Sequence, residues 1–343
     1  MRVTFTVTLP HSISDRIVDQ ETKPARGNRR SKNRRRKVFA VLPTLLTLGN
    51  AVCGFGAIMI LARVGPAISA DVLKMVSPAE TASFLEEQVR YFSEQMVFAS
   101  QLIFLAMLFD ALDGSAARLT NQTSEFGAQL DSLCDVISFG VAPAFLMLKL
   151  THPNNRLMSL VVDSPFLLEY WPRILSAFAT LFVLCAVMRL ARFNTETEED
   201  DSHEGFSGLP SPAAAGVIAS MPIGIMGLNS LLAEDTSRWS SFVGDRVLPG
   251  LTMLLPFITL ATALLMVSRI RYPHLFNQLV RGQRGPRQIV LIVFVGVLIC
   301  VVHEVAVPVL FCWFAFAAPA RGLWYRYLKP LLSGRSGTGA AAE

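Results

Sequence analysis

Long apolar stretches recur along this chain of 343 residues, and they constrain its fold more than any other feature. They fall at 40–63, 95–117, 127–150, 173–193, 209–233, 247–268, 288–302 and 305–320. The first six are long enough to cross about 30 Å of hydrocarbon as helices. Only 17% of the residues are charged, which is typical of a polytopic membrane protein and not of a soluble domain. The sequence therefore predicts an all-α, polytopic transmembrane helical bundle.

The last two stretches are short and are separated only by His303 and Glu304. We expect them to form a tight C-terminal hairpin, which gives eight spans, with six or seven as the alternatives. The expected organisation is a disordered basic arm over 1–38, a transmembrane domain with a six-helix core over 39–270, and the hairpin and tail over 271–343.

Basic residues are distributed unevenly along the chain. Eleven of the 31 Lys and Arg residues precede the first span, and 23 of them fall on the cytoplasmic side if both ends of an eight-span protein are cytoplasmic. This asymmetry follows the positive-inside rule. We therefore expect a multi-pass protein of the cell (inner) membrane with a cytoplasmic N-terminus. The basic tract at 26–37 is interpreted as an orientation signal with affinity for anionic lipid headgroups, and no nucleic-acid partner is expected.

Four aspartates lie where the second apolar stretch ends and the third begins. Asp110 and Asp113 are three residues apart, and Asp131 and Asp135 are four apart, so each pair shares one face of a helix. The polar segment 119–126 suits a turn between antiparallel helices. Ionised carboxylates are costly at membrane depth. Four together predict a cation site at the cytoplasmic face, and their hard oxygen atoms suit Mg²⁺ or Mn²⁺.

The aspartates belong to a longer pattern, D-x2-D-G-x2-A-R-x8-G-x3-D-x3-D, in residues 110–135. This pattern resembles the signature of the CDP-alcohol phosphatidyltransferases at all eight fixed positions. Segments 42–55, 130–144, 189–194 and 206–214 are in addition similar to the family's phosphatidylserine synthase branch. The resemblance implies transfer of a phosphatidyl group from CDP-diacylglycerol to a small alcohol, with release of CMP.

The resemblance also implies roles for the acidic residues. Asp110, Asp113 and Asp131 would be metal ligands in a two-metal site for Mg²⁺ or Mn²⁺. Asp135 would be a further ligand and the general base on the acceptor hydroxyl.

Residues of the pattern and of the first span are implied to contact the nucleotide. Small residues let a base or pyrophosphate approach the backbone closely, and a guanidinium can donate two hydrogen bonds to a phosphate. In the first span, a common form of the phosphatidylserine synthase branch has Asn directly after the proline, whereas this chain has Thr44. The residues implied to bind the nucleotide part are Thr47, Asn50, Gly114, Ala117, Arg118 and Gly127.

The end of the fourth span is implied to bind the acceptor. Arg189 and Arg192 would bind a phosphate or an amino-acid carboxylate, and Asn194 would orient the acceptor. L-serine is the predicted acceptor, because three segments outside the signature are similar to the phosphatidylserine synthase branch. Glycerol 3-phosphate or an inositol compound is the alternative, although a phosphorylated acceptor would need a denser basic pocket.

Two further expectations concern the whole protein. The CDP-alcohol phosphatidyltransferases usually form homodimers, so a homodimer in the lipid bilayer is expected on that ground. A cation-coupled transporter is the alternative from another class of protein. Transporters typically carry repeated halves and ion sites near the midplane, whereas this sequence has no internal repeat and its acids lie at one membrane edge.

Overall fold

A computed structural model of the chain describes residues 26–64, 78–120, 125–152, 165–196, 208–233, 240, 242–270, 272 and 303–324. Within these ranges the regular structure is helical, which confirms the predicted class. The helices are α1 (Arg26–Arg63), α3 (Pro78–Thr120), α4 (Glu125–Asp135), α5 (Ala142–Thr151), α7 (Pro165–Glu196), α8 (Ser211–Ala233), α10 (Leu248–Val267) and α13 (His303–Leu323). Two π-helices, η1 (Val136–Val141) and η2 (Val243–Val247), precede α5 and α10.

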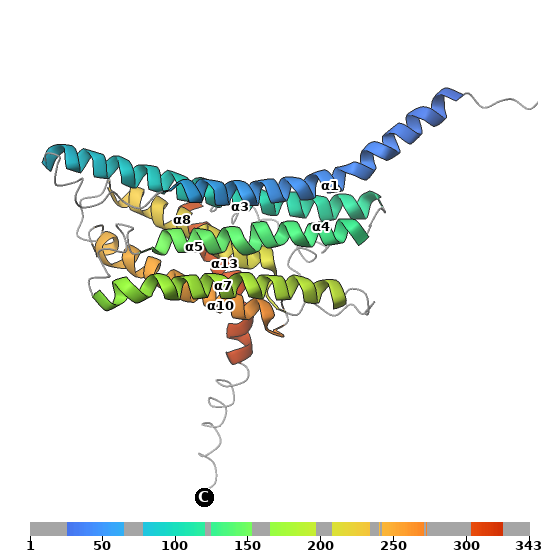
Figure 1. Ribbon diagram of the computed structural model, residues 1–343. Coiled ribbons are helices and arrows are strands. Elements are labelled where there is room, and N and C mark those ends of the chain that lie inside the picture. The colour runs from blue at the N-terminus through green and yellow to red at the C-terminus, as the bar shows by residue number, and fades with distance from the viewer. Residues whose placement is uncertain are drawn as a thin grey trace, which may run out of the picture.

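Most of the helices lie side by side in an elongated bundle (Figure 1). The continuous rod of α4, η1 and α5 lies at its centre, because α5 contacts α1, α3, α7, α8 and α10. In the most apolar part of the span formed by this rod, 61% of the residues are buried. The corresponding share is 67% for α8 and only 6% for α13. The site-bearing rod is therefore held on several sides, and α13 is peripheral.

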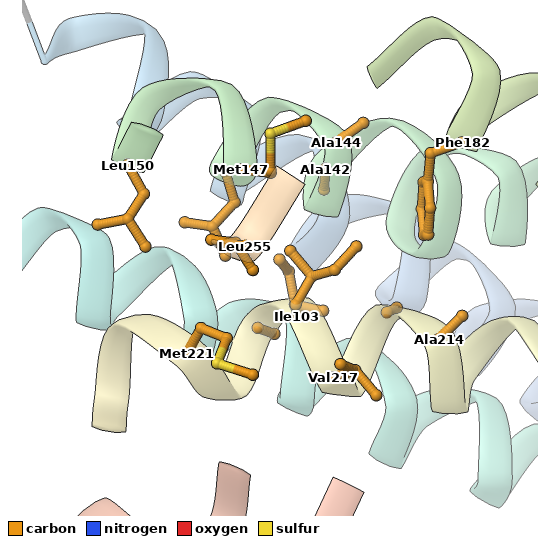
Figure 2. Close-up of a cluster of buried hydrophobic side chains, with 14 of the residues drawn as sticks. Ile103, Ala142, Ala144, Met147, Leu150, Phe182, Ala214, Val217, Met221 and Leu255 are labelled. Carbon is orange, nitrogen blue, oxygen red and sulfur yellow. The ribbon is translucent and has the colours of Figure 1, made fainter. Parts of the chain in front are cut away.

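Apolar side chains from α3, α5, α7, α8 and α10 meet in the core (Figure 2). Ile103, Met147, Leu150, Phe182 and Leu255 are all fully buried there. Lipid tails are as apolar as these side chains, so close packing between helices, and not exclusion of water, accounts for much of their association.

Seven of the described helices are long and apolar enough to cross a membrane. They cover 42–63, 86–116, 125–151, 169–195, 211–229, 248–267 and 304–322, and they agree with seven of the eight predicted stretches. The remaining stretch, 288–302, lies outside the described residues, so the eighth span stays a prediction.

Two helices extend beyond the expected boundaries. The backbone is helical from Arg26, whereas disorder is expected over 1–38, and Pro43 lies inside α1. Arg and Lys are good helix formers, so the basic tract continues the helix of the span. α3 begins at Pro78 and runs into the second span without a break, since no Gly or Pro lies between residues 79 and 113.

Candidate functional site

Three of the four aspartates form a compact acidic cluster. Asp110 and Asp113 lie near the end of α3, and Asp131 lies on α4. One carboxylate oxygen from each of the three lies within 4.8 Å of the other two. The Asp113 and Asp131 carboxyl groups are within hydrogen-bonding distance of each other. Carboxylates this close repel one another unless a proton or a cation lies between them.

The cluster fits a divalent metal ion. Oxygen ligands at about 2.0–2.1 Å from one octahedral Mg²⁺ lie about 3–4 Å apart, which small side-chain rotations of these three groups would reach. The Oδ1 atom of Asp131 is buried and has no hydrogen-bond partner in the part of the chain that the structure describes. A cation would satisfy this atom. All the ligands are hard oxygens, which favours Mg²⁺ or Mn²⁺ over zinc.

Asp135 lies beside the cluster and has a partner of its own. It is the last residue of α4 and only 7% of its surface is exposed. The Asn50 Nδ2 donates to Asp135 Oδ1 at 2.9 Å, and the charge of Asp135 interacts with those of Asp110, Asp113 and Asp131. The fourth carboxylate is thus oriented by a neutral amide at the edge of the acidic cluster.

α1 supplies hydrogen bonds to two of the carboxylates. Thr47 Oγ1 donates to Asp113 Oδ2 at 2.8 Å, one turn before the bond from Asn50 to Asp135. Both side chains are buried. Residues three apart on a helix share a face, so α1 reaches α3 and α4 from one side. The structure therefore brings Thr47 and Asn50 to the aspartates. Their contacts with the nucleotide stay a prediction.

Gly54 and Ser138 set the distance between α1 and η1. A Cβ atom on Gly54 would overlap Ser138 Oγ and lie 2.6 Å from Ser138 Cα. The Ser138 hydroxyl donates to the Asn50 backbone oxygen at 2.9 Å. The sequence assigns these two residues no role, because only the fold brings segments about 85 residues apart together. Their contact keeps α1, and so Asn50, close to Asp135.

Arg189 on α7 is the basic side chain described beside the aspartates. Its Nη1 donates to Ser211 Oγ at 2.7 Å, and its charge interacts with those of Asp110 and Asp135. Its Nε is buried and lacks a partner among the described residues. The Nε–H is thus available to bind an anion next to the carboxylates.

The two other predicted acceptor residues lie further along α7. Asn194 and Ser132 exchange hydrogen bonds of 2.9 and 3.3 Å, which join the end of α7 to α4. Arg192 is partly buried on the same helix. Asn194 is therefore hydrogen-bonded to α4, the helix that carries Asp131 and Asp135.

For the small and basic residues of the signature, the structure describes the surroundings of Gly114 and Gly127 but only the backbone of Ala117 and Arg118. Gly114 and Gly127 are partly buried on α3 and α4, and Gly114 directly follows Asp113. Ala117 and Arg118 belong to the backbone of α3, but their side chains lie outside the description. Contacts of these four residues with a nucleotide stay predictions.

Comparison with known protein families matches residues 40–244 to the CDP-alcohol phosphatidyltransferases. The match covers more than half of the chain and includes the part of α1 from residue 40, all of α3, α4, α5, α7 and α8, and the four aspartates. The chain belongs to the CDP-alcohol phosphatidyltransferase family, as its signature predicts.

Several curated relatives show which members of the family the chain is similar to. The chain is 37% identical over 182 residues to the CDP-diacylglycerol–serine O-phosphatidyltransferase of Helicobacter pylori strain ATCC 700392 / 26695, covering 53% of this chain and 63% of that protein. It is 34% identical over 178 residues to the enzyme of the same name from Methanocaldococcus jannaschii, covering 52% and 65%. It is 34% identical over 174 residues to the archaetidylserine synthase of Methanothermobacter thermautotrophicus, covering 50% and 56%. The chain thus spans less than two thirds of the length of these relatives.

Proposed function

We propose that the protein transfers the phosphatidyl group of CDP-diacylglycerol to L-serine, giving phosphatidylserine and CMP, in phospholipid biosynthesis. The observation that carries this proposal is the acidic cluster of Asp110, Asp113 and Asp131, with Asp135 held beside it by Asn50. Membership of the family supports the type of reaction. The names of the relatives from H. pylori and M. jannaschii support serine as the acceptor.

Asp110, Asp113 and Asp131 would hold divalent cations, Mg²⁺ or Mn²⁺, with Asp135 as a further ligand. Such ions neutralise a pyrophosphate and stabilise the leaving phosphate of an in-line displacement. The buried, unpartnered Oδ1 of Asp131 supports this role within the described part of the site.

Asp135 is proposed as the general base. One of its oxygens accepts a hydrogen bond from Asn50, so its orientation is fixed while the other oxygen is left to accept the proton of the serine hydroxyl. The serine oxygen then forms the new bond to phosphorus as the bond to CMP breaks. Burial of Asp135 keeps bulk water away from this step, which favours transfer over hydrolysis.

Arg189 is proposed to bind the serine carboxylate. Its free Nε and its position beside Asp110 and Asp135 support this role, because a guanidinium binds a carboxylate with two hydrogen bonds in one plane. Arg192 and Asn194 are proposed to complete the acceptor end. The residues proposed to face the CDP part are Thr47, Asn50, Gly114, Ala117, Arg118 and Gly127.

The membrane orientation is also part of the proposal. The excess of Lys and Arg before the first span supports a cytoplasmic N-terminus. The aspartates lie towards the same end of the bundle as Thr47 and Asn50 at the start of the first span. We therefore place the active site at the cytoplasmic face of a cell membrane. A homodimer is proposed from the family's usual assembly.

The proposal is tested by CMP release from the purified protein in detergent, with CDP-diacylglycerol, Mn²⁺ and L-serine, glycerol 3-phosphate or inositol in separate reactions. We expect release only with L-serine, loss of release in EDTA and its return with added Mn²⁺ or Mg²⁺. Asp135→Asn should lower the rate by at least a thousandfold, because it removes both the base and a metal ligand.

Glu125→Gln is the matched control for the loss of one negative charge, because Glu125 is exposed in the first turn of the same helix, α4. It should keep the parent rate. Release that requires glycerol 3-phosphate or inositol would contradict the serine assignment and leave the reaction type standing. No release with any acceptor from folded protein would contradict the reaction itself.

A further inference from the structure

The loop that leads into α8 is bonded to the chain segment at the end of α10. The Gly208 backbone N–H donates to the Ile270 carbonyl at 2.9 Å, and the Leu209 N–H donates to the Leu265 carbonyl at 3.0 Å. Gly208 has φ +91°, and a Cβ atom there would overlap the Met266 carbonyl oxygen. A residue other than glycine would therefore be strained and would also push the loop away from α10.

This loop ends at the residue that holds Arg189. Ser211 is fully buried at the start of α8, and its hydroxyl accepts a hydrogen bond from Arg189 Nη1 at 2.7 Å. The position of Ser211 follows from that of Gly208, because only two residues separate them. The end of α10 thus helps to set the position of the guanidinium beside Asp135.

Tyr272 fixes the segment after α10 to α13. Its side chain is 3% exposed, its ring packs against Phe314 with centroids 6.1 Å apart, and its hydroxyl donates to the Ala315 carbonyl at 2.9 Å. In an α-helix this carbonyl would accept from the N–H of residue 319, but residue 319 is proline and has no N–H. The Tyr272 hydroxyl therefore takes the place of the missing helical donor.

α13 is itself closely packed against α8. Glycines on α8 leave room for α13 side chains, since a Cβ atom on Gly216 would overlap the Phe311 ring and one on Gly224 would lie 2.7 Å from Pro308 Cγ. The Phe311 ring also meets Phe104 of α3, with centroids 5.4 Å apart. These contacts make α13 a specifically docked helix.

We propose that Ile270, Tyr272 and α13, here called the C-terminal brace, position Arg189 for the acceptor through the Gly208 loop. All residues of the brace lie beyond residue 244, where the family match ends. The acceptor-binding role of Arg189 rests on the proposed function, whereas the contacts of the brace do not. Tyr272 is thus inferred to be a positioning residue that acts on the site from outside the family's matched region.

The test uses the full chain and a pair of variants. Tyr272→Phe removes the hydroxyl, and Tyr272→Phe combined with Pro319→Ala also restores a helical N–H for the Ala315 carbonyl. We expect the single variant to lower the melting temperature and the double variant to recover it. Both variants lack the hydrogen bond from Tyr272, so the KM for L-serine should be raised in both. We expect an increase of about fivefold, which is the usual effect of losing one hydrogen bond. The KM for CDP-diacylglycerol should not change.

Amide hydrogen exchange measures the brace without activity. Exchange at Gly208 and Leu209 should be faster than in the parent in both variants. Gly208→Ala should raise the serine KM further, whereas its control Gly250→Ala should not, because a Cβ on Gly250 of α10 meets no atom within 4 Å.

Unchanged exchange at Gly208 and Leu209 in Tyr272→Phe would overturn the proposal. A double variant that recovers both the melting temperature and the serine KM would also overturn it, because Tyr272 would then only satisfy a carbonyl. If the parent released no CMP with serine, the proposed function would fail, and the exchange rates alone would decide whether the brace exists.

Discussion

At the scale of single residues, the site depends on two hydrogen bonds from one face of α1. Thr47 and Asn50 each fix one carboxylate oxygen, on Asp113 and Asp135. Hydrogen bonds to charged groups contribute about 1.5–3 kcal/mol, and in a catalytic site they also determine which oxygen faces the substrate. The polar stripe of the first span therefore orients the acidic residues.

Asn50→Ala should lower kcat by about tenfold to a hundredfold, since each tenfold corresponds to about 1.4 kcal/mol and the variant loses one bond to a charged group. The rate of CMP release at saturating CDP-diacylglycerol and L-serine measures this effect. Thr44→Ala is the control from the same helix, because Thr44 is not among the described partners of the aspartates. A parent-like kcat in Asn50→Ala would show that Asp135 needs no orientation from α1.

At the scale of helices, the contact between α1 and η1 determines whether these bonds can form. The π-helical turn begins directly after Asp135, and the Ala142 N–H bonds to the Ile137 carbonyl, five residues earlier. π-Helical turns are frequent at functional sites. Here the turn places Ser138 against the backbone of α1 at Gly54. A side chain at position 54 would have no room, because its Cβ atom would overlap Ser138.

Gly54→Ala should destabilise the protein by about 1–3 kcal/mol, the usual cost of overpacking, and should also lower the rate because α1 must move away from Asp135. Thermal unfolding in detergent and CMP release measure the two effects. Gly56→Ala is the matched control on the same helix, because its Cβ would lie at an ordinary 3.5 Å from Leu102 Cδ1. Equal melting temperatures for the two variants would contradict the close contact.

Local spacing explains which parts of the site could be predicted from the sequence. Asp110 and Asp113 share a helical face by their separation alone, and the polar segment after them predicts the turn that brings Asp131 back. The partners of the carboxylates could not be predicted in this way. Asn50 and Asp135 are 85 residues apart, and the periodicity within either helix cannot predict a contact between the two helices.

At the scale of the whole molecule, hydropathy predicts the spans well but not their order in space. It gives the position of α13, but not that the helix docks on glycines of α8. Hydropathy also cannot show that Tyr272 bonds to a carbonyl left without a donor by Pro319. These features depend on the packing of distant helices, and they connect the C-terminal part of the chain to the acceptor end of the site.

The bond from Tyr272 makes a prediction about stability at high pH. Burial raises the pKa of Tyr272 to about 12, compared with about 10 for an exposed tyrosine. A pKa raised in the folded state means that the protonated hydroxyl stabilises the fold fully below pH 10, and that this contribution is lost as the pH rises to about 12. The melting temperature of the parent should therefore exceed that of Tyr272→Phe at pH 8, and the difference should shrink between pH 10 and 12.

Scanning fluorimetry of both proteins in one detergent over this pH range measures the difference in melting temperature. Other groups titrate equally in the two proteins, so their effect cancels in the difference. Parallel curves for the two proteins up to pH 12 would contradict a buried hydroxyl that donates to the Ala315 carbonyl.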